Sequence, residues 1–207
     1  MREESPLRHS TRALAVASFL LAVAAGARAQ SVQITPFAGY AFGGSVRDAA
    51  LDESRSFDAA LAYGGSVSFP MSESWRFELL YSRQETKLAG GLGQSFDVTI
   101  ERYLAGFQEE KGEGGNVRLF GTVWLGATRF VPGLAGFDSE TKFGGGVGLG
   151  VKTFLAKNVG LRFEARGLYT LVNGEGGVFC SNGSCLFAFS GRGLWQGDVS
   201  AGLILAF

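Results

Sequence analysis

The sequence predicts an all-β fold, an eight-stranded antiparallel up-and-down transmembrane β-barrel. Three observations predict it. Eight segments alternate apolar residues with small or polar ones, their connections alternate between short and long, and the last apolar segment ends on the aromatic residue Phe207. The composition agrees, because 32 glycines and 18 phenylalanines against four prolines in 207 residues favour strands over helices or disorder.

The first segment of the chain is expected to lie outside this barrel. Three arginines precede an apolar run from Ala13 to Ala25, and the small-residue pattern Ala27-Arg28-Ala29 follows it. This order is typical of a secretory signal peptide, and the run is shorter than the ~20 residues that a membrane-spanning helix needs. We therefore predict a cleaved signal peptide at residues 1–29 and an outer-membrane β-barrel domain at residues 30–207.

The predicted strands follow from period-two alternation, in which successive side chains point to opposite faces of a sheet. They lie at residues 32–42, 56–69, 75–86, 97–108, 116–130, 141–155, 159–172 and 193–207. The short connections are residues 70–74, 109–115 and 156–158, and the long ones are 43–55, 87–96, 131–140 and 173–192. Short turns at one end and long loops at the other are typical of outer-membrane barrels.

Alternation alone does not say which face of each strand is inside, because a soluble lipocalin-like barrel has the same period. The small residues decide. One face of segment 56–69 carries alanine, glycine and serine, and one face of segment 141–155 carries glycine at every second position from Gly144 to Gly150. An eight-stranded barrel is only wide enough inside for side chains to fill it, so we predict that these small residues point inward.

Charged residues of both signs share the predicted inner face. Mixed charges in a dry interior are tolerated when they are paired and hydrogen-bonded, so they predict a plugged lumen rather than an open pore. The predicted lumen charge network comprises Arg76, Glu78, Arg118, Lys152, Arg162, Glu164, Arg166 and Asp198.

Aromatic residues occupy the opposite face and are expected to form the girdles at the two membrane interfaces. The predicted interface aromatics are Trp75, Tyr81, Phe57, Phe69 and Tyr169. One position resists strict alternation, because Glu101 and Arg102 are adjacent and one of them would face lipid. We expect a β-bulge or a snorkelling Arg102 to accommodate this pair.

The sequence offers little for catalysis. Its only histidine, His9, lies in the predicted signal peptide, which excludes histidine-dependent enzymes and common zinc sites in the barrel. Paired carboxylates such as Glu101 and Glu164 would remain candidates for acid–base catalysis only if both faced the lumen. No catalytic, cofactor-binding or metal-ligating residue is predicted, and the glycines at 144–150 depart from the dinucleotide and P-loop patterns.

The charge of the chain excludes one class of partner, and its two cysteines suggest a covalent link. Four of the 19 basic and two of the 19 acidic residues lie in residues 1–29, which leaves a net charge of −2 beyond them and no basic patch for nucleic acid. The two cysteines, Cys180 and Cys185, enclose four residues, and export would place them in an oxidising compartment. We expect a disulfide that closes the longest loop.

The chain resembles the outer membrane protein β-barrel domain family, the small porin-like barrels related to the OmpA membrane domain and OmpX. The resemblance rests on ITPFAGYAFGG at 34–44, the glycine-rich GGGVGLG at 144–150 and the terminal LILAF at 203–207. It implies that Phe207 is the signal for insertion by the barrel assembly machinery. We also expect outer-membrane lipids and lipopolysaccharide as partners.

These observations predict a non-enzymatic barrel of the bacterial outer membrane with a structural or surface-interaction role. Two alternatives remain open at this point. One is a narrow conduit for small or hydrophobic solutes, suggested by the small inner residues. The other is a soluble exported lipocalin-like binder whose aromatic face would line a ligand cavity. No motif in the sequence identifies a ligand.

Overall fold

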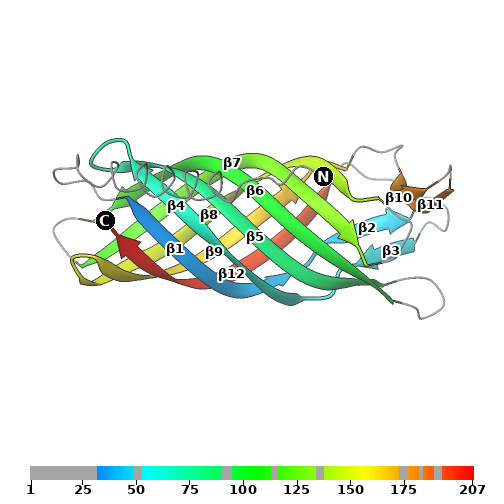
Figure 1. The fold of residues 1–207 in the computed structure, drawn as a ribbon, viewed down its shortest axis with the longest axis horizontal. Helices are drawn as coiled ribbons and strands as arrows, with labels where there is room; N and C mark the ends of the chain where they lie inside the picture. Colours follow the sequence, from blue (N-terminus) through cyan, green and yellow to red (C-terminus); the bar gives the residue numbers. More distant parts are fainter. Residues whose placement is uncertain are drawn as a thin grey trace, which may run out of the picture.

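The computed structural model describes residues 32–48, 53–89, 95–112, 116–133, 138–172, 177–181, 184–188 and 193–207. Eight antiparallel strands close into a barrel, which confirms the predicted fold class (Figure 1). Among these residues no helix is long and apolar enough to cross a membrane. The barrel strands are β1 (Gln33–Phe42), β4 (Ala60–Pro70), β5 (Trp75–Ala89), β6 (Ser95–Lys111), β7 (Val117–Pro132), β8 (Glu140–Ala156), β9 (Val159–Thr170) and β12 (Leu194–Ala206).

Two short hairpins lie outside the barrel sheet, within the first and the last of the predicted long loops. They are formed by β2 (Ser45–Asp48) with β3 (Glu53–Ser56) and by β10 (Gly177–Ser181) with β11 (Ser184–Ala188). Figure 1 shows both hairpins at one end of the barrel, which we call the loop end. The β4–β5 and β8–β9 connections lie at the other end, the turn end. Residues 1–31, including the predicted signal peptide, lie outside the described residues.

The strands are tilted because the pairing register drifts around the barrel. A path through directly paired residues leaves β4 at Pro70, crosses β5, β6, β7, β8, β9, β12 and β1, and returns to β4 at Ala60. This shift of ten residues along one strand is the stagger that closes eight tilted strands into a barrel. Rows of neighbouring side chains therefore climb toward the loop end as they pass from β4 to β7.

Side chains alternate strictly between the two faces of the wall. On β4, Ala62, Ser66 and Ser68 are buried, whereas Leu61 and Tyr63 are exposed on the outside. The same alternation runs along β5 and β9, so the small and charged face points inward and the apolar face points outward. The predicted orientation is confirmed, and a soluble barrel with an inward apolar face does not match it.

An apolar cluster fills the lumen at the loop end. It comprises Phe57, Leu88, Val98, Ile100, Phe130, Val172 and Leu194. The prediction that Phe57 belongs to an outer girdle is wrong, because this residue is only 6% exposed. Its ring stacks on that of Phe130, with the two ring centroids 6.4 Å apart. Phe57 forms an isolated antiparallel bridge with Leu88 of β5 that is shifted by one residue from the β4–β5 register, and its N–H donates to the Gly44 carbonyl.

The glycines of β8 make room for large side chains of the neighbouring strand β7. A Cβ atom on Gly148 would lie 2.5 Å from Cη2 of Trp124 and 2.9 Å from Glu164 Oε1. Trp124 is fully buried and packs with Leu80, Leu104 and Leu168 in the middle of the barrel. The glycine stripe of β8 therefore leaves space for the tryptophan ring of the neighbouring strand β7.

We expect Gly148→Leu to lower the free energy of unfolding by about 1 to 3 kcal/mol, because an inserted side chain overpacks the site that Trp124 fills. Urea unfolding of the refolded barrel in lipid vesicles measures this change. Gly167→Leu on β9 is the matched control, since a Cβ there meets nothing nearer than Val147 Cγ2 at 4.0 Å. Equal losses for the two variants would contradict the packing argument.

Candidate functional site

The lumen contains layers of polar side chains that bond across the barrel, beginning at the turn end. Lys152 on β8 donates from Nζ to Gln33 of β1 at 2.9 Å, to Gln108 of β6 at 2.5 Å and to Glu110 of β6 at 2.6 Å. Glu110 also accepts from Arg118 Nη1 at 3.2 Å. Three strands that are not neighbours in the barrel are thereby joined by one buried ammonium group.

A second layer lies one step further in and is built around Glu78 of β5. Arg162 of β9 reaches this carboxylate with both terminal nitrogens, of which Nη2 lies 3.1 Å from Oε1. The same Nη2 donates to Glu164 Oε1 at 2.8 Å, and Trp124 Nε1 donates to Glu78 at 3.2 Å. The Arg162 guanidinium also lies over the Phe120 ring, 4.5 Å from its centroid. All these side chains are buried, so the cation and the carboxylates depend on one another.

A third layer precedes the apolar cluster at the loop end. Arg166 of β9 pairs with Asp198 of β12, with Nε 2.8 Å and Nη2 2.6 Å from Oδ1. Arg102 of β6 donates to the Gln196 amide oxygen at 2.5 Å, and Gln84 Oε1 lies 3.5 Å from the same nitrogen. Arginine, carboxylate and amide groups thus occupy the cross-section just below the apolar cluster.

The structure places the predicted lumen residues in these layers. Seven of the eight are buried, and Arg118 lies at the turn end with its side chain partly exposed beside Glu110. Sequence reasoning missed several members of the layers. These are Gln33, Gln84, Arg102, Gln108, Glu110, Trp124 and Gln196. All of them occupy inward-facing positions of their strands, and the alternation of side chains along each strand could have identified them.

The outer wall is apolar and carries aromatic residues toward both ends. Trp75 and Phe69 are exposed near the turn end, and Tyr81 is exposed near the middle of β5. Tyr169 is half-buried against Trp195, with ring centroids 4.8 Å apart. An apolar surface that surrounds a closed barrel marks contact with lipid.

Glu101 is a carboxylate on this outer wall, because Arg102 takes the inward position. No bulge is needed, since β6 keeps its register with both neighbours through this pair. Four donors from three strands face the Glu101 carboxylate. They are Tyr81 Oη and Tyr103 Oη at 3.3 Å each, Arg83 Nη1 at 3.4 Å and Arg129 Nη1 at 3.7 Å. The expectation of a bulge or an outward Arg102 is therefore wrong.

Glu101 and Glu164 do not form a carboxylate pair. Glu164 points into the lumen and Glu101 points outward, so the barrel wall separates them. Within the described ranges, no group of three or more histidine, cysteine, aspartate or glutamate residues could hold a metal ion.

Cys180 and Cys185 pair opposite each other in the β10–β11 register. Their side chains lie outside what the structure describes. The disulfide stays a prediction.

A closed barrel with an apolar outer wall and polar side chains on its inner face defines an integral β-barrel membrane protein. The sequence pattern of the family described as outer membrane protein beta-barrel domain matches residues 15–203, and the chain belongs to this family. The protein is accordingly assigned to the bacterial outer membrane. No curated protein sequence matches the chain.

Solved structures with the same fold come from other outer-membrane proteins. Neisserial surface protein A is 19% identical, with a TM-score of 0.61, and the match covers 88% of this chain and 99% of that one. OprG from Pseudomonas aeruginosa is 14% identical, with a TM-score of 0.56 and coverage of 88% and 98%. The N-terminal β-barrel domain of Pseudomonas aeruginosa OprF is 16% identical, with a TM-score of 0.50 and coverage of 84% and 97%. At these identities the likeness concerns the fold alone.

Proposed function

We propose that this protein is a non-enzymatic barrel with a closed lumen and a structural or surface-interaction role in the outer membrane. The observation that carries the proposal is the stack of buried, mutually bonded side chains from the turn end to the apolar cluster. Each layer joins strands that are not neighbours in the barrel, as Lys152 joins β8 to β1 and β6. The carboxylates Glu78 and Glu164 are engaged by Arg162, so neither is available as a base.

The closed lumen follows from the energetics of these layers. A hydrated ion would have to separate Glu78 from Arg162 and Asp198 from Arg166 inside a low-dielectric interior. Breaking a buried ion pair leaves an uncompensated charge, at a cost of ~3 to 5 kcal/mol. Beyond these layers the ion would meet the apolar cluster, which offers it no ligand. Both barriers act in series, so the barrel is expected to exclude ions.

The surface role rests on the hairpins at the loop end, which extend the chain beyond the barrel (Figure 1). Export by a signal peptide at residues 1–29, a disulfide between Cys180 and Cys185, contact with lipopolysaccharide and insertion by the assembly machinery through Phe207 are parts of this proposal. Loops carried on a rigid scaffold are where recognition residues concentrate.

Purified protein in planar lipid bilayers is expected to give no steady open-channel current. A variant with alanine at positions 78, 124 and 162 loses the side chains that fill one cross-section, and it serves as the control for an opened lumen. Faster gel migration of unheated samples shows that each variant is a folded barrel. Steady currents from the unchanged protein would overturn the closed lumen.

A second candidate function is a conduit for small or hydrophobic solutes, favoured by the apolar cluster at the mouth of the lumen. Ion conductance does not test it, because an apolar solute need not carry current. Influx of a neutral apolar dye into proteoliposomes does. Influx above that of empty vesicles, abolished by Ile100→Trp in the cluster, would replace our first proposal with this one.

A further inference from the structure

A groove on the outer wall crosses β4, β5, β6 and β7 and has a volume of about 440 Å³. Small residues, Gly65 and Ala105, lie between the aliphatic side chains of Val67, Leu79 and Leu125. Because the groove opens on the lipid-facing side and its lining is apolar, it suits a hydrocarbon chain.

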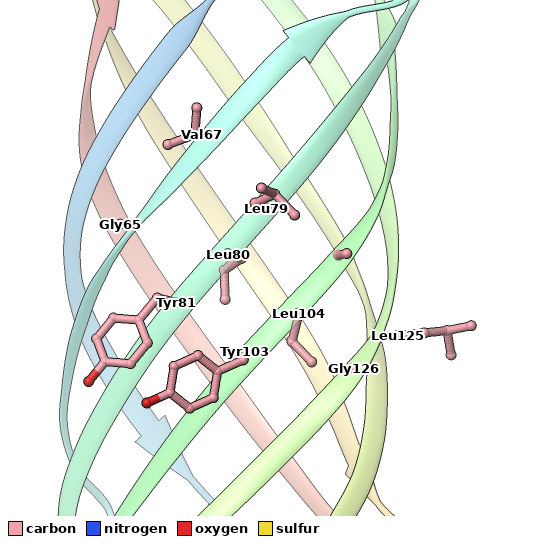
Figure 2. A pocket seen from close by; sticks show the side chains of 10 residues that line it. Gly65, Val67, Leu79, Leu80, Tyr81, Tyr103, Leu104, Leu125 and Gly126 are labelled. Atoms are coloured by element: carbon pink, nitrogen blue, oxygen red, sulfur yellow. The ribbon is translucent and has the colours of Figure 1, made fainter. Parts of the chain in front are cut away.

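The groove ends toward the loop end at two tyrosines. Figure 2 shows Tyr81 and Tyr103 side by side on β5 and β6, with both hydroxyls pointing in the same direction, away from Leu79. Their ring centroids are 5.2 Å apart, and both hydroxyls donate to Glu101. An apolar channel therefore meets a polar boundary, as an amphiphilic molecule would require.

Beyond the tyrosines the surface exposes cations rather than the carboxylate. The Glu101 side chain is only 12% exposed, whereas Arg83 is 36% and Arg129 is 46% exposed. Glu85 also pairs with Arg83, and Ser139 accepts hydrogen bonds from Arg129 Nε at 3.3 Å and Nη2 at 3.0 Å. These contacts are exposed to the surroundings, and exposed contacts of this kind are weak. A stronger acceptor can therefore share the outward N–H groups of the two arginines.

The depth of this cluster matches the outer membrane interface. Eight residues separate Trp75 from Arg83 on β5, which corresponds to about 20 Å along the membrane normal for a strand tilted by about 40°. The apolar band of such barrels is about 25 Å tall. The backbone of Arg83 therefore lies about 5 Å inside the outer edge of this band, and a long arginine side chain can span that distance to the headgroups of outer-leaflet lipids.

We propose that this wall is a specific binding site for one phosphorylated lipid of the outer leaflet, with an acyl chain in the groove and a phosphate between Arg83 and Arg129. Arginine binds phosphate through charge-assisted hydrogen bonds, and here two guanidinium groups flank one position. The proposal specifies the site of the lipopolysaccharide contact proposed above and rests on it. It is independent of whether the lumen conducts.

The test measures lipid A that remains bound after the barrel is extracted from bilayers of phosphatidylcholine and lipid A. Mass spectrometry of the intact complex counts lipid per barrel. Arg83→Gln/Arg129→Gln is expected to lower retention at least about tenfold, from the loss of charged hydrogen bonds. Gly65→Leu, which fills the groove, is expected to lower it as well. A Cβ at Gly65 meets only Thr35 O at 3.8 Å, so the wall tolerates it.

Matched controls separate this site from general contact with lipid. Gly121→Leu places the same side chain elsewhere on the outer wall, and Arg118→Gln removes an arginine at the turn end. Both should retain lipid A at the original level, and equal losses in all four variants would overturn the site.

Two further arms identify the ligand. Dephosphorylated lipid A should be retained poorly. Inorganic phosphate should not raise the thermal unfolding midpoint. If phosphate alone stabilised the barrel as well as lipid A, the ligand would be a free anion and the acyl groove would have no role. If no lipid A were retained by the unchanged protein while the bilayer currents stayed absent, this proposal would fail and the closed lumen would stand.

Discussion

Glu78→Leu is expected to lower the free energy of unfolding of the barrel by about 3 to 5 kcal/mol, because it leaves Arg162 buried without its main partner. Trp124 Nε1 loses its acceptor in the same variant. Urea unfolding in lipid vesicles measures the change. Glu78→Gln keeps a hydrogen-bond acceptor for Trp124 and should be less harmful than Glu78→Leu.

Two further variants show whether the effect comes from pairing. Glu109→Leu makes the same chemical change on the outside of β6 near the turn end, where Glu109 pairs weakly with Lys111, and should change stability little. The double variant Glu78→Leu/Arg162→Met should lose less than the sum of the two single variants, because the charges are removed together. Strict additivity, or a loss no larger than that of Glu109→Leu, would show that the lumen is hydrated.

Deletion of Phe207 is expected to reduce the amount of barrel in the outer membrane severalfold while leaving its unfolding in vitro nearly unchanged. Phe207 is 66% exposed on the lipid side, and its N–H donates to the Val32 carbonyl at 3.0 Å. Asn158 holds the preceding residue through two hydrogen bonds to Ala206. The folded barrel therefore depends little on Phe207, so a large loss in cells would arise during assembly.

Quantitative immunoblotting of outer-membrane fractions measures this loss, with urea unfolding of refolded protein as the companion measurement. Phe207→Tyr should retain assembly. Trp195→Ala, which removes an exposed aromatic residue at the other end of β12, and deletion of residues 134–137 should each cost less than the loss of Phe207. Unchanged membrane levels without Phe207 would contradict its role as the assembly signal.

The barrel was predictable because each strand separates lipid from a narrow interior. Apolar residues and small or polar residues therefore alternate along every strand. The small residues of β4 and β8 also gave the orientation, since only the inside of an eight-stranded barrel is crowded. Phe57 was assigned wrongly for a physical reason. Its parity matches the outer face of β4, but the ladder is interrupted at Asp58 and Ala59, and the ring folds over the mouth.

The layers of the lumen were only partly predictable. Arg102 could have been placed inward from Tyr103 and Phe107, whose aromatic side chains fix the outward parity of β6. Glu110 was missed because β6 extends three residues beyond the predicted end at 108. Which charges bond to which was not predictable, because pairs such as Arg162 and Glu78 join strands brought together only by barrel closure.

Glu101 also constrains the order in which the wall can form. A carboxylate that entered hydrocarbon on β6 alone would have only Tyr103 of the same strand as a donor, and each unsatisfied polar group there costs several kcal/mol. Two of its donors come from β5 and one from β7. These three strands must therefore be side by side before this part of β6 leaves water, which makes β5–β6–β7 a unit of membrane insertion.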